Sequence, residues 1–187
     1  MLVPAVVLSL RLLSPPLLCE PLAPVAELVA APSSVPLPPD SALTAAYGRG
    51  MTWEAFLADA RARREMWLRN WERAVVPADA LALLATLPPG FRVLAIAVDS
   101  CSDSVNTIPY IAKLVESVPG LSLRVVKPRD ARDLMSARRT PDGRAATPTV
   151  ILLDAEGNEV GCWVERPAAL QAIAREANAG GGTPGFA

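Results

Sequence analysis

Residues 91–98 constrain the fold of this chain more than any other segment. Their sequence, FRVLAIAV, is rich in aliphatic and β-branched side chains and carries a single charge, on Arg92. An apolar run without polar alternation is typical of a strand that is buried on both faces. Such a strand lies inside a sheet with helices on both sides, so the segment predicts a layered α/β domain.

Helical and strand patterns alternate after this run. Strands are expected at residues 121–126, 148–153 and 159–164, and helices up to residue 118 (kinked at Pro109), at 129–138 and at 167–178. Helices between strands favour parallel pairing, whereas the turn at 154–158 favours an antiparallel hairpin at the edge. We therefore expect an α/β domain over residues 89–178, with a mixed four- to five-stranded sheet and helices on both faces.

Residues 51–88 are expected to form an N-terminal helical extension. Apolar residues recur at three- and four-residue steps from residue 52 to 74, with Thr52 as the N-cap. An aromatic stripe at this spacing is explained by packing against a core, in preference to a ligand site. A shorter helix begins at Pro77 and is closed by residues 88–90.

The first 50 residues have a different composition. Nine of the 19 prolines lie in residues 1–40 and interrupt the apolar run, and no basic residue precedes Arg11. A secretory signal has a basic start and an unbroken apolar core, and a membrane span is longer. We expect residues 1–50 to be a disordered leader or an over-extended start ahead of Met51; the alternative is an export signal in residues 1–31. The Gly-rich residues 179–187 are expected to form a disordered tail.

Composition excludes several classes of function. The chain contains no histidine, which removes Ser-His-Asp triads, Cys-His proteases and His-metal sites. The net charge of −1 does not favour a nucleic-acid or membrane partner. Three widely spaced cysteines indicate neither a disulfide framework nor a zinc site, and they fit a reducing cytoplasm. We expect a monomer without a bound metal.

Cys101 is the candidate reactive residue. It lies where the buried strand ends and a helix begins, and unpaired first-turn amides together with the helix dipole favour a thiolate there. The alternative is a cysteine that merely packs in a turn. Asp103 is interpreted as a helix cap or as a catalytic acid, and Ser104 as a hydrogen-bond donor to the thiolate or as part of the helix start.

The remaining cysteines and the basic residues are less informative. Cys162 shares a strand face with Val160 and Val164, which favours a structural role over that of a resolving thiol, and Cys19 has no assignable role. Basic residues gather between positions 124 and 144 but are interleaved with aspartates. A solvated mixed surface is therefore favoured over a site for the carboxylates of a small thiol or for a partner.

Several of these features together resemble the thioredoxin superfamily. They are Cys101 at the strand-to-helix junction, Pro109 eight residues later, and Thr147-Pro148 before a later strand. Residues 101–103, 157–159 and 165–167 resemble a bacterial branch with a W-C-x-D-type motif and an N-terminal helical extension. The resemblance implies a nucleophilic Cys101, a cis Pro148 that faces it, and Thr147 as a contact for a thiol co-substrate.

The chain also departs from the thioredoxin pattern. Ser100 replaces the usual tryptophan, Ser104 replaces the second cysteine, and Ala95 stands where thioredoxins have a buried acid. The resemblance therefore implies a monothiol mechanism with Cys101, Asp103, Ser104 and Pro148 as catalytic residues. Protein disulfides or a low-molecular-weight thiol would be its partners, and no further cofactor is expected. The alternatives are a non-catalytic binding or adaptor protein and a peroxide-sensing thiol.

Overall fold

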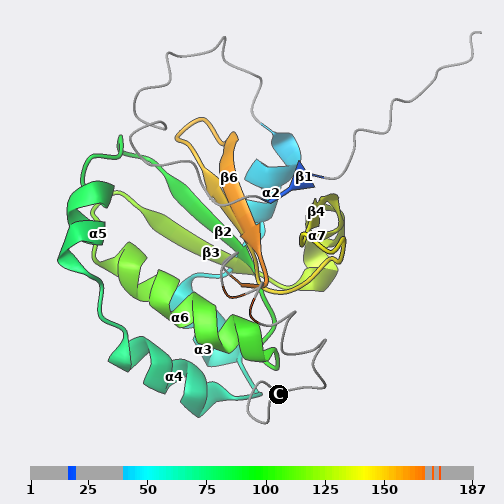
Figure 1. The fold of residues 1–187 in the computed structure, drawn as a ribbon, viewed down its shortest axis with the longest axis horizontal. Coiled ribbons are helices and arrows are strands. Elements are labelled where there is room, and N and C mark those ends of the chain that lie inside the picture. Colours follow the sequence, from blue (N-terminus) through cyan, green and yellow to red (C-terminus); the bar gives the residue numbers. More distant parts are fainter. Residues whose placement is uncertain (1–16, 20–39, 167–169, 171–172, 174–187) are drawn as a thin grey trace, which may run out of the picture.

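A four-stranded mixed sheet forms the centre of the computed structural model, which describes residues 17–19, 40–166, 170 and 173 (Figure 1). Its order is β3-β2-β5-β6, made by β2 (Arg92–Ile96), β3 (Ser122–Val126), β5 (Thr149–Leu153) and β6 (Glu159–Val164). β3 pairs with β2 in parallel, and β5 and β6 form an antiparallel hairpin. The predicted α/β class and mixed sheet are confirmed.

The pairing of β5 with β2 differs from the prediction. Helices before β5 favoured parallel pairing, but β5 runs antiparallel to β2, with Ile96 opposite Thr149. The connection from β3 contains the short helix η1 (Pro128–Asp130), α7 (Arg132–Ala137) and β4 (Arg138–Arg139). The six residues of α7 span roughly 9 Å, too little to carry the chain back across the sheet. The chain therefore re-enters the sheet from the edge at which β2 and β3 end.

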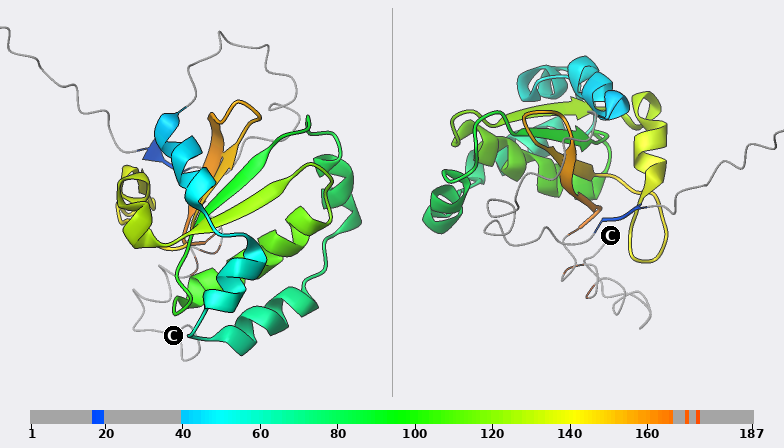
Figure 2. Two further views of the ribbon diagram at one scale, coloured as in Figure 1. Left: turned by 180° about the vertical axis from the view of Figure 1, so that it is seen from behind. Right: turned by 90° about the horizontal axis from the view of Figure 1, so that it is seen from above.

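Helices cover both faces of the sheet (Figure 2). On one face, α3 (Trp53–Asp59), α4 (Arg64–Arg73) and α6 (Ser102–Glu116) pack on the sheet through a core that contains Trp53, Phe56 and Trp67. On the other face, α2 (Ser41–Arg49) and α7 cover the second core. β2 supplies Ala95 to the first core and Leu94 to the second, as expected for a strand buried on both faces. The predicted core role of the aromatic stripe is confirmed.

The N-terminal boundary of the folded unit was predicted wrongly. Residues 40–50 belong to the fold, because Asp40 caps α2 through the N–H group of Ala42 at 2.9 Å and Leu43 and Ala46 are buried. Without α2, apolar residues of β2 and β5 would face water. The sequence of this nine-residue helix does not show that distant strands pack against it. Residues 1–16 and 20–39 lie outside the described residues, as does most of the predicted helix at 167–178 and the whole of the tail.

A disulfide joins Cys19 to Cys162, so the expectation of no disulfide was wrong. Cys162 is buried in the second core, and the short strand β1 (Leu17–Leu18) pairs with β4 beside it. The two cysteines have a sequence separation of 143, which carries no information on their distance in the fold. Of the helices described, none is long and apolar enough to cross a membrane.

A side chain of α4 completes the hydrogen bonding of α6, the helix that contains Pro109. Pro109 lies inside α6 and has no N–H group to donate to the Val105 carbonyl oxygen one turn earlier. The Asn70 side-chain amide donates to that oxygen instead, at 2.8 Å. The N-terminal helical extension, which ends with α5 (Ala78–Leu84), thus supplies the hydrogen-bond donor that Pro109 of α6 lacks.

Replacing Asn70 by alanine should lower the free energy of unfolding by about 1–2 kcal/mol, because the Val105 carbonyl loses its partner. In a Pro109→Ala background the cost should shrink, because residue 109 then supplies its own N–H group. Urea unfolding of the four proteins measures both values, and an equal cost in both backgrounds would contradict the assignment. Asn106→Ala, which removes only a 3.3 Å contact of Asn70, is the control and should change little.

Leu43→Ala tests whether α2 is part of the folded unit. Leu43 is buried, so its truncation should cost about 2–4 kcal/mol in urea unfolding under non-reducing conditions. Thr44→Ala alters the neighbouring exposed position and should stay within about 0.5 kcal/mol. Equal effects of the two substitutions would show that α2 contributes nothing to the fold.

Candidate functional site

Cys101 lies at the carboxyl edge of the sheet, between the end of β2 and the first turn of α6. It is the N-cap of α6, and its sulfur accepts a hydrogen bond from the Ser104 N–H group at 3.5 Å. The thiol donates to the Thr147 carbonyl oxygen, with Sγ and O 3.3 Å apart. Cys101 is half-buried and is the one free cysteine, since the other two are joined. The thiol is therefore partly accessible to a second sulfur.

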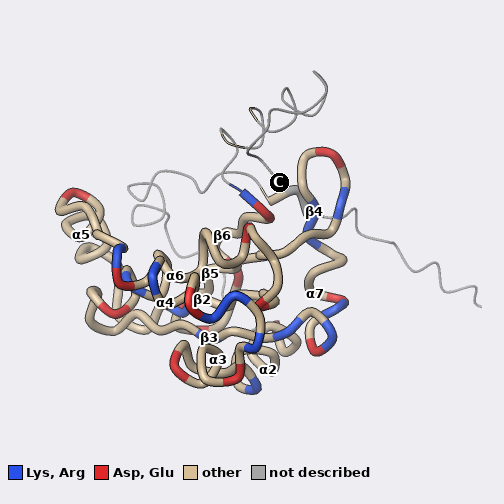
Figure 3. The backbone as a smooth tube through the Cα atoms, turned by 90° about the horizontal axis from the view of Figure 1, so that it is seen from below, with Lys and Arg blue, Asp and Glu red and all other residues tan. Residues whose placement is uncertain are grey.

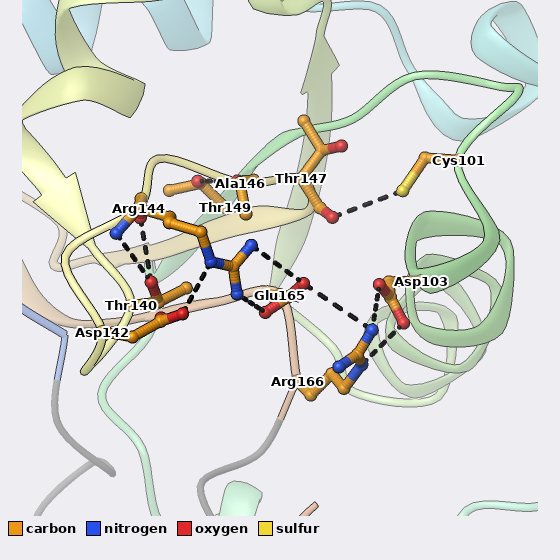
Figure 4. A network of polar contacts seen from close by, with 10 residues as sticks. All are labelled: Cys101, Asp103, Thr140, Asp142, Arg144, Ala146, Thr147, Thr149, Glu165 and Arg166. Carbon is orange, nitrogen blue, oxygen red and sulfur yellow. Dashed lines mark hydrogen bonds and ion pairs between the residues drawn. The ribbon is translucent and has the colours of Figure 1, made fainter. Parts of the chain in front are cut away.

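Thr147 faces Cys101 just before the start of β5 (Figure 4). The peptide bond between Thr147 and Pro148 is cis. The Pro148 carbonyl accepts from the Glu165 N–H group at 2.7 Å, and the Thr149 hydroxyl donates to the Ala146 carbonyl at 2.8 Å. This segment is thus held from both sides, and Cys101, Thr147 and Pro148 come together at one edge of the sheet.

Ser104 contacts the sulfur through its backbone. Its N–H group donates to Cys101 Sγ, while its side chain is fully buried and its hydroxyl has no hydrogen-bond partner among the described residues. The arrangement supports the interpretation of Ser104 as part of the helix start. The interpretation of its hydroxyl as a donor to the thiolate has no support in this geometry.

Asp103 forms an ion pair, which neither interpretation of this residue anticipated. Its two carboxylate oxygens accept from Arg166 Nε at 3.0 Å and from Nη2 at 2.9 Å. The hydrogen bonds to Asp103 raise the pKa of Arg166 above its ordinary value. Asp103 therefore connects the start of α6 to the segment that follows β6. Sequence reasoning missed Arg166, although residues 165–167 formed part of the resemblance.

The pair between Asp103 and Arg166 is one end of a chain of alternating charges (Figure 4). Arg166 approaches Glu165 at 3.6 Å, Glu165 accepts from Arg144 Nη2 at 3.0 Å, and Arg144 donates to Asp142 at 2.7 Å. The hydrogen bond from Arg144, followed by that from Thr140, lowers the pKa of Asp142 to about 2. This series of ion pairs connects the first turn of α6 to the loop that precedes Thr147.

The residues between α3 and α4 form hydrogen bonds to the turn that precedes Cys101. One carboxylate oxygen of Asp99 accepts from the N–H groups of Arg61 at 2.8 Å and Ala62 at 2.9 Å. Trp67 Nε1 donates to the Asp99 carbonyl and Arg63 Nε to the Ser100 carbonyl, both at 3.0 Å. The predicted single helix over 52–74 is therefore two helices, because the N–H groups freed by the break bind Asp99.

The basic residues between positions 124 and 144 are mixed with acidic ones (Figure 3). Lys127 pairs with Asp59, Arg138 with Glu159, and Arg129 with Asp130. The pairs of Lys127 and Arg129 agree with the expected mixed surface, whereas Arg138 is buried and differs from that expectation. Within the part of the chain that the structure describes, no group of three potential metal ligands is brought together.

Asp99→Asn tests the contact between the extension and the turn before Cys101. The N–H group of Ala62, followed by that of Arg61, lowers the pKa of Asp99, so its charged form stabilises the fold above the ordinary pKa of about 3.9. This stabilisation is lost as the pH falls through the lower, folded pKa. Asparagine keeps an oxygen acceptor without the charge.

The variant should therefore be less stable than the natural chain at pH 7, by about 1–2 kcal/mol, and the difference should shrink as the pH falls below the ordinary carboxyl pKa of about 3.9 and through the lower, folded pKa. Urea unfolding between pH 7 and pH 2.5 measures this convergence. A difference that stays the same at all pH values would contradict the assignment.

Comparison with known proteins places this geometry in a family. Residues 50–178 match the family model described as thioredoxin. The fold is similar to that of a protein of unknown function from Pseudomonas aeruginosa, at 22% identity and a TM-score of 0.62, over 72% of this chain and 83% of that one. It is also similar to an HIV epitope scaffold, at 22% identity and a TM-score of 0.60, over 74% of this chain and 88% of that one.

At these identities the two structures show a shared fold alone, and no curated protein sequence matches the chain. The family match carries more weight, because it extends over most of the chain and includes both Cys101 and Pro148. The resemblance to the thioredoxin superfamily is confirmed, and the chain belongs to the thioredoxin family.

Proposed function

We propose that this protein catalyses thiol–disulfide exchange with Cys101 as its single nucleophile. The observation that carries the proposal is the position of the sulfur. It is half-buried, contacts a first-turn N–H group of α6, and faces Thr147 beside the cis peptide bond. N–H groups at a helix start stabilise a thiolate, which is the attacking species in exchange.

The exchange proceeds in two steps. The Cys101 thiolate attacks one sulfur of a substrate disulfide R–S–S–R′, so that a Cys101–S–S–R bond forms and R′–S⁻ leaves and takes up a proton. An external thiolate R″–S⁻ then attacks the R sulfur, forms R–S–S–R″, and releases the Cys101 thiolate. The protein undergoes no net oxidation, because one disulfide replaces another.

The resolving thiol in this proposal comes from outside the protein. Position 104 holds a buried serine, so no local disulfide can form there. Cys162 is bonded to Cys19 and lies in the core beneath α2, on the face of the sheet opposite α6. Low-molecular-weight thiols and protein disulfides remain the proposed partners, with no cofactor beyond them.

The proposal also concerns the cellular compartment in which the protein acts. A reducing cytoplasm was expected from the low cysteine content, with export as the alternative. The pairing of Cys19 with Cys162 favours the exported alternative, because disulfides persist in oxidising compartments.

A binding module without turnover is the second candidate. It is favoured by Ala95, which occupies the fully buried position where thioredoxins have an acid. Proton transfer to the leaving thiolate then depends on solvent or on the substrate.

Cys101→Ser separates the two candidates. Incubation with oxidised glutathione should add one glutathione to Cys101, seen by mass spectrometry of the peptide, and reduced glutathione should remove it. The natural chain should also deglutathionylate a model peptide, and Cys101→Ser should lose both reactions while keeping its thermal unfolding temperature. An adduct without peptide turnover would contradict the proposed activity and favour the binding module.

Ser104→Cys is the matched gain-of-function variant. Because the N–H group of residue 104 already contacts Cys101 Sγ, a thiol at this position should form a local disulfide with Cys101. The variant should reduce protein disulfides such as those of insulin in the presence of dithiothreitol, faster than the natural chain. Failure of this local disulfide to form would show that the two side chains are not adjacent.

A further inference from the structure

Asp103 places a negative charge within one helical turn of the proposed nucleophile. It lies two residues after Cys101 in the first turn of α6. A carboxylate near a sulfur disfavours the thiolate and opposes the helix dipole. The site therefore contains a charge that would work against its own nucleophile unless it is compensated.

Arg166 supplies the compensation. It holds both carboxylate oxygens of Asp103 at 3.0 and 2.9 Å, and the two side chains are only 23% and 26% exposed. Partial removal from water strengthens a two-point pair of this kind. In Figure 4 the Asp103 carboxylate faces Arg166, while the Cys101 sulfur faces Thr147.

The backbone around Arg166 is fixed to the same edge of the sheet. Glu165 has a positive φ of 67° and donates its N–H group to the Pro148 carbonyl at 2.7 Å. The Arg166 N–H group donates to the Val164 carbonyl at 2.9 Å. The segment that positions the Arg166 guanidinium is therefore the one that is hydrogen-bonded to Pro148. The guanidinium is thus fixed relative to the site.

We propose that Arg166 is a positioning residue for Cys101, which neutralises Asp103 and holds its carboxylate away from the sulfur. This inference rests on the proposed function in taking Cys101 as the nucleophile. It concerns the reactivity of the thiol itself, so it can be tested without any substrate disulfide.

Alkylation of Cys101 by iodoacetamide, followed from pH 5 to pH 10, provides the test. Arg166→Gln should slow alkylation at pH 7 by roughly three- to tenfold and move the rate profile to higher pH, because Asp103 is left uncompensated. Adding Asp103→Asn to Arg166→Gln should restore the rate to within twofold of the natural chain. Arg129→Gln removes an exposed positive charge elsewhere and should leave the rate unchanged.

A purely structural role for Arg166 predicts another pattern. The loss in rate would then persist in the Asp103→Asn/Arg166→Gln double variant, and that result would overturn the inference, as would an unchanged profile in Arg166→Gln. Salt gives a second readout, since 1 M NaCl should recover part of the rate only in the single variant. If Arg166→Gln does not fold, Arg166→Lys should show a smaller shift of the same sign, again removed by Asp103→Asn.

Deglutathionylation measured on the same variants separates the two proposals. A shifted alkylation profile without peptide turnover in the natural chain would refute the proposed function and leave the role of Arg166 intact. Turnover in the natural chain with an unshifted profile in Arg166→Gln would refute the role of Arg166 alone.

Discussion

The antiparallel register of β2 and β5 determines the rest of this structure. Because Ile96 lies opposite Thr149, the end of one strand meets the beginning of the other at one edge of the sheet. The residues that follow β2 and those that precede β5 therefore face each other, which brings Cys101 to the Thr147 carbonyl. A parallel β5 would have placed Pro148 at the opposite edge, a strand length of roughly 17 Å away.

The helical extension acts as part of the site. The break between α3 and α4 directs backbone N–H groups at Asp99, and Asn70 of α4 satisfies the carbonyl that Pro109 leaves without a donor. Both contacts hold the segment that carries Cys101, one just before it and one just after it. The segment that follows β6 is also held to the site, here by ion pairs that lead from Asp103 through Arg166 to Asp142. The sulfur thus lies between elements fixed by three distant parts of the sequence.

The sequence predicts what depends on local pattern. A buried strand that runs into a helix places Cys101, and a proline before an apolar run places β5, because both signals lie within a few residues. The antiparallel β5, the core position of Leu43 and the pair of Asp103 with Arg166 depend on contacts between distant residues. Asn70 could have been suspected, since a polar side chain lies between Trp67 and Trp71 on a helix that packs through its aromatic residues. Its partner, a carbonyl deprived of a donor by Pro109, becomes apparent only when the two helices are side by side.

The bond between Cys19 and Cys162 has a mechanical consequence. It connects the N-terminal part of the chain directly to β6 and bypasses α2, α6 and the first three strands of the sheet. Tension applied to the two ends of the chain would pass through the sulfur atoms and leave the β2–β5 pairing unloaded. A protease that cuts one exposed connection between these cysteines would likewise leave a single covalent molecule, whose pieces separate only after reduction.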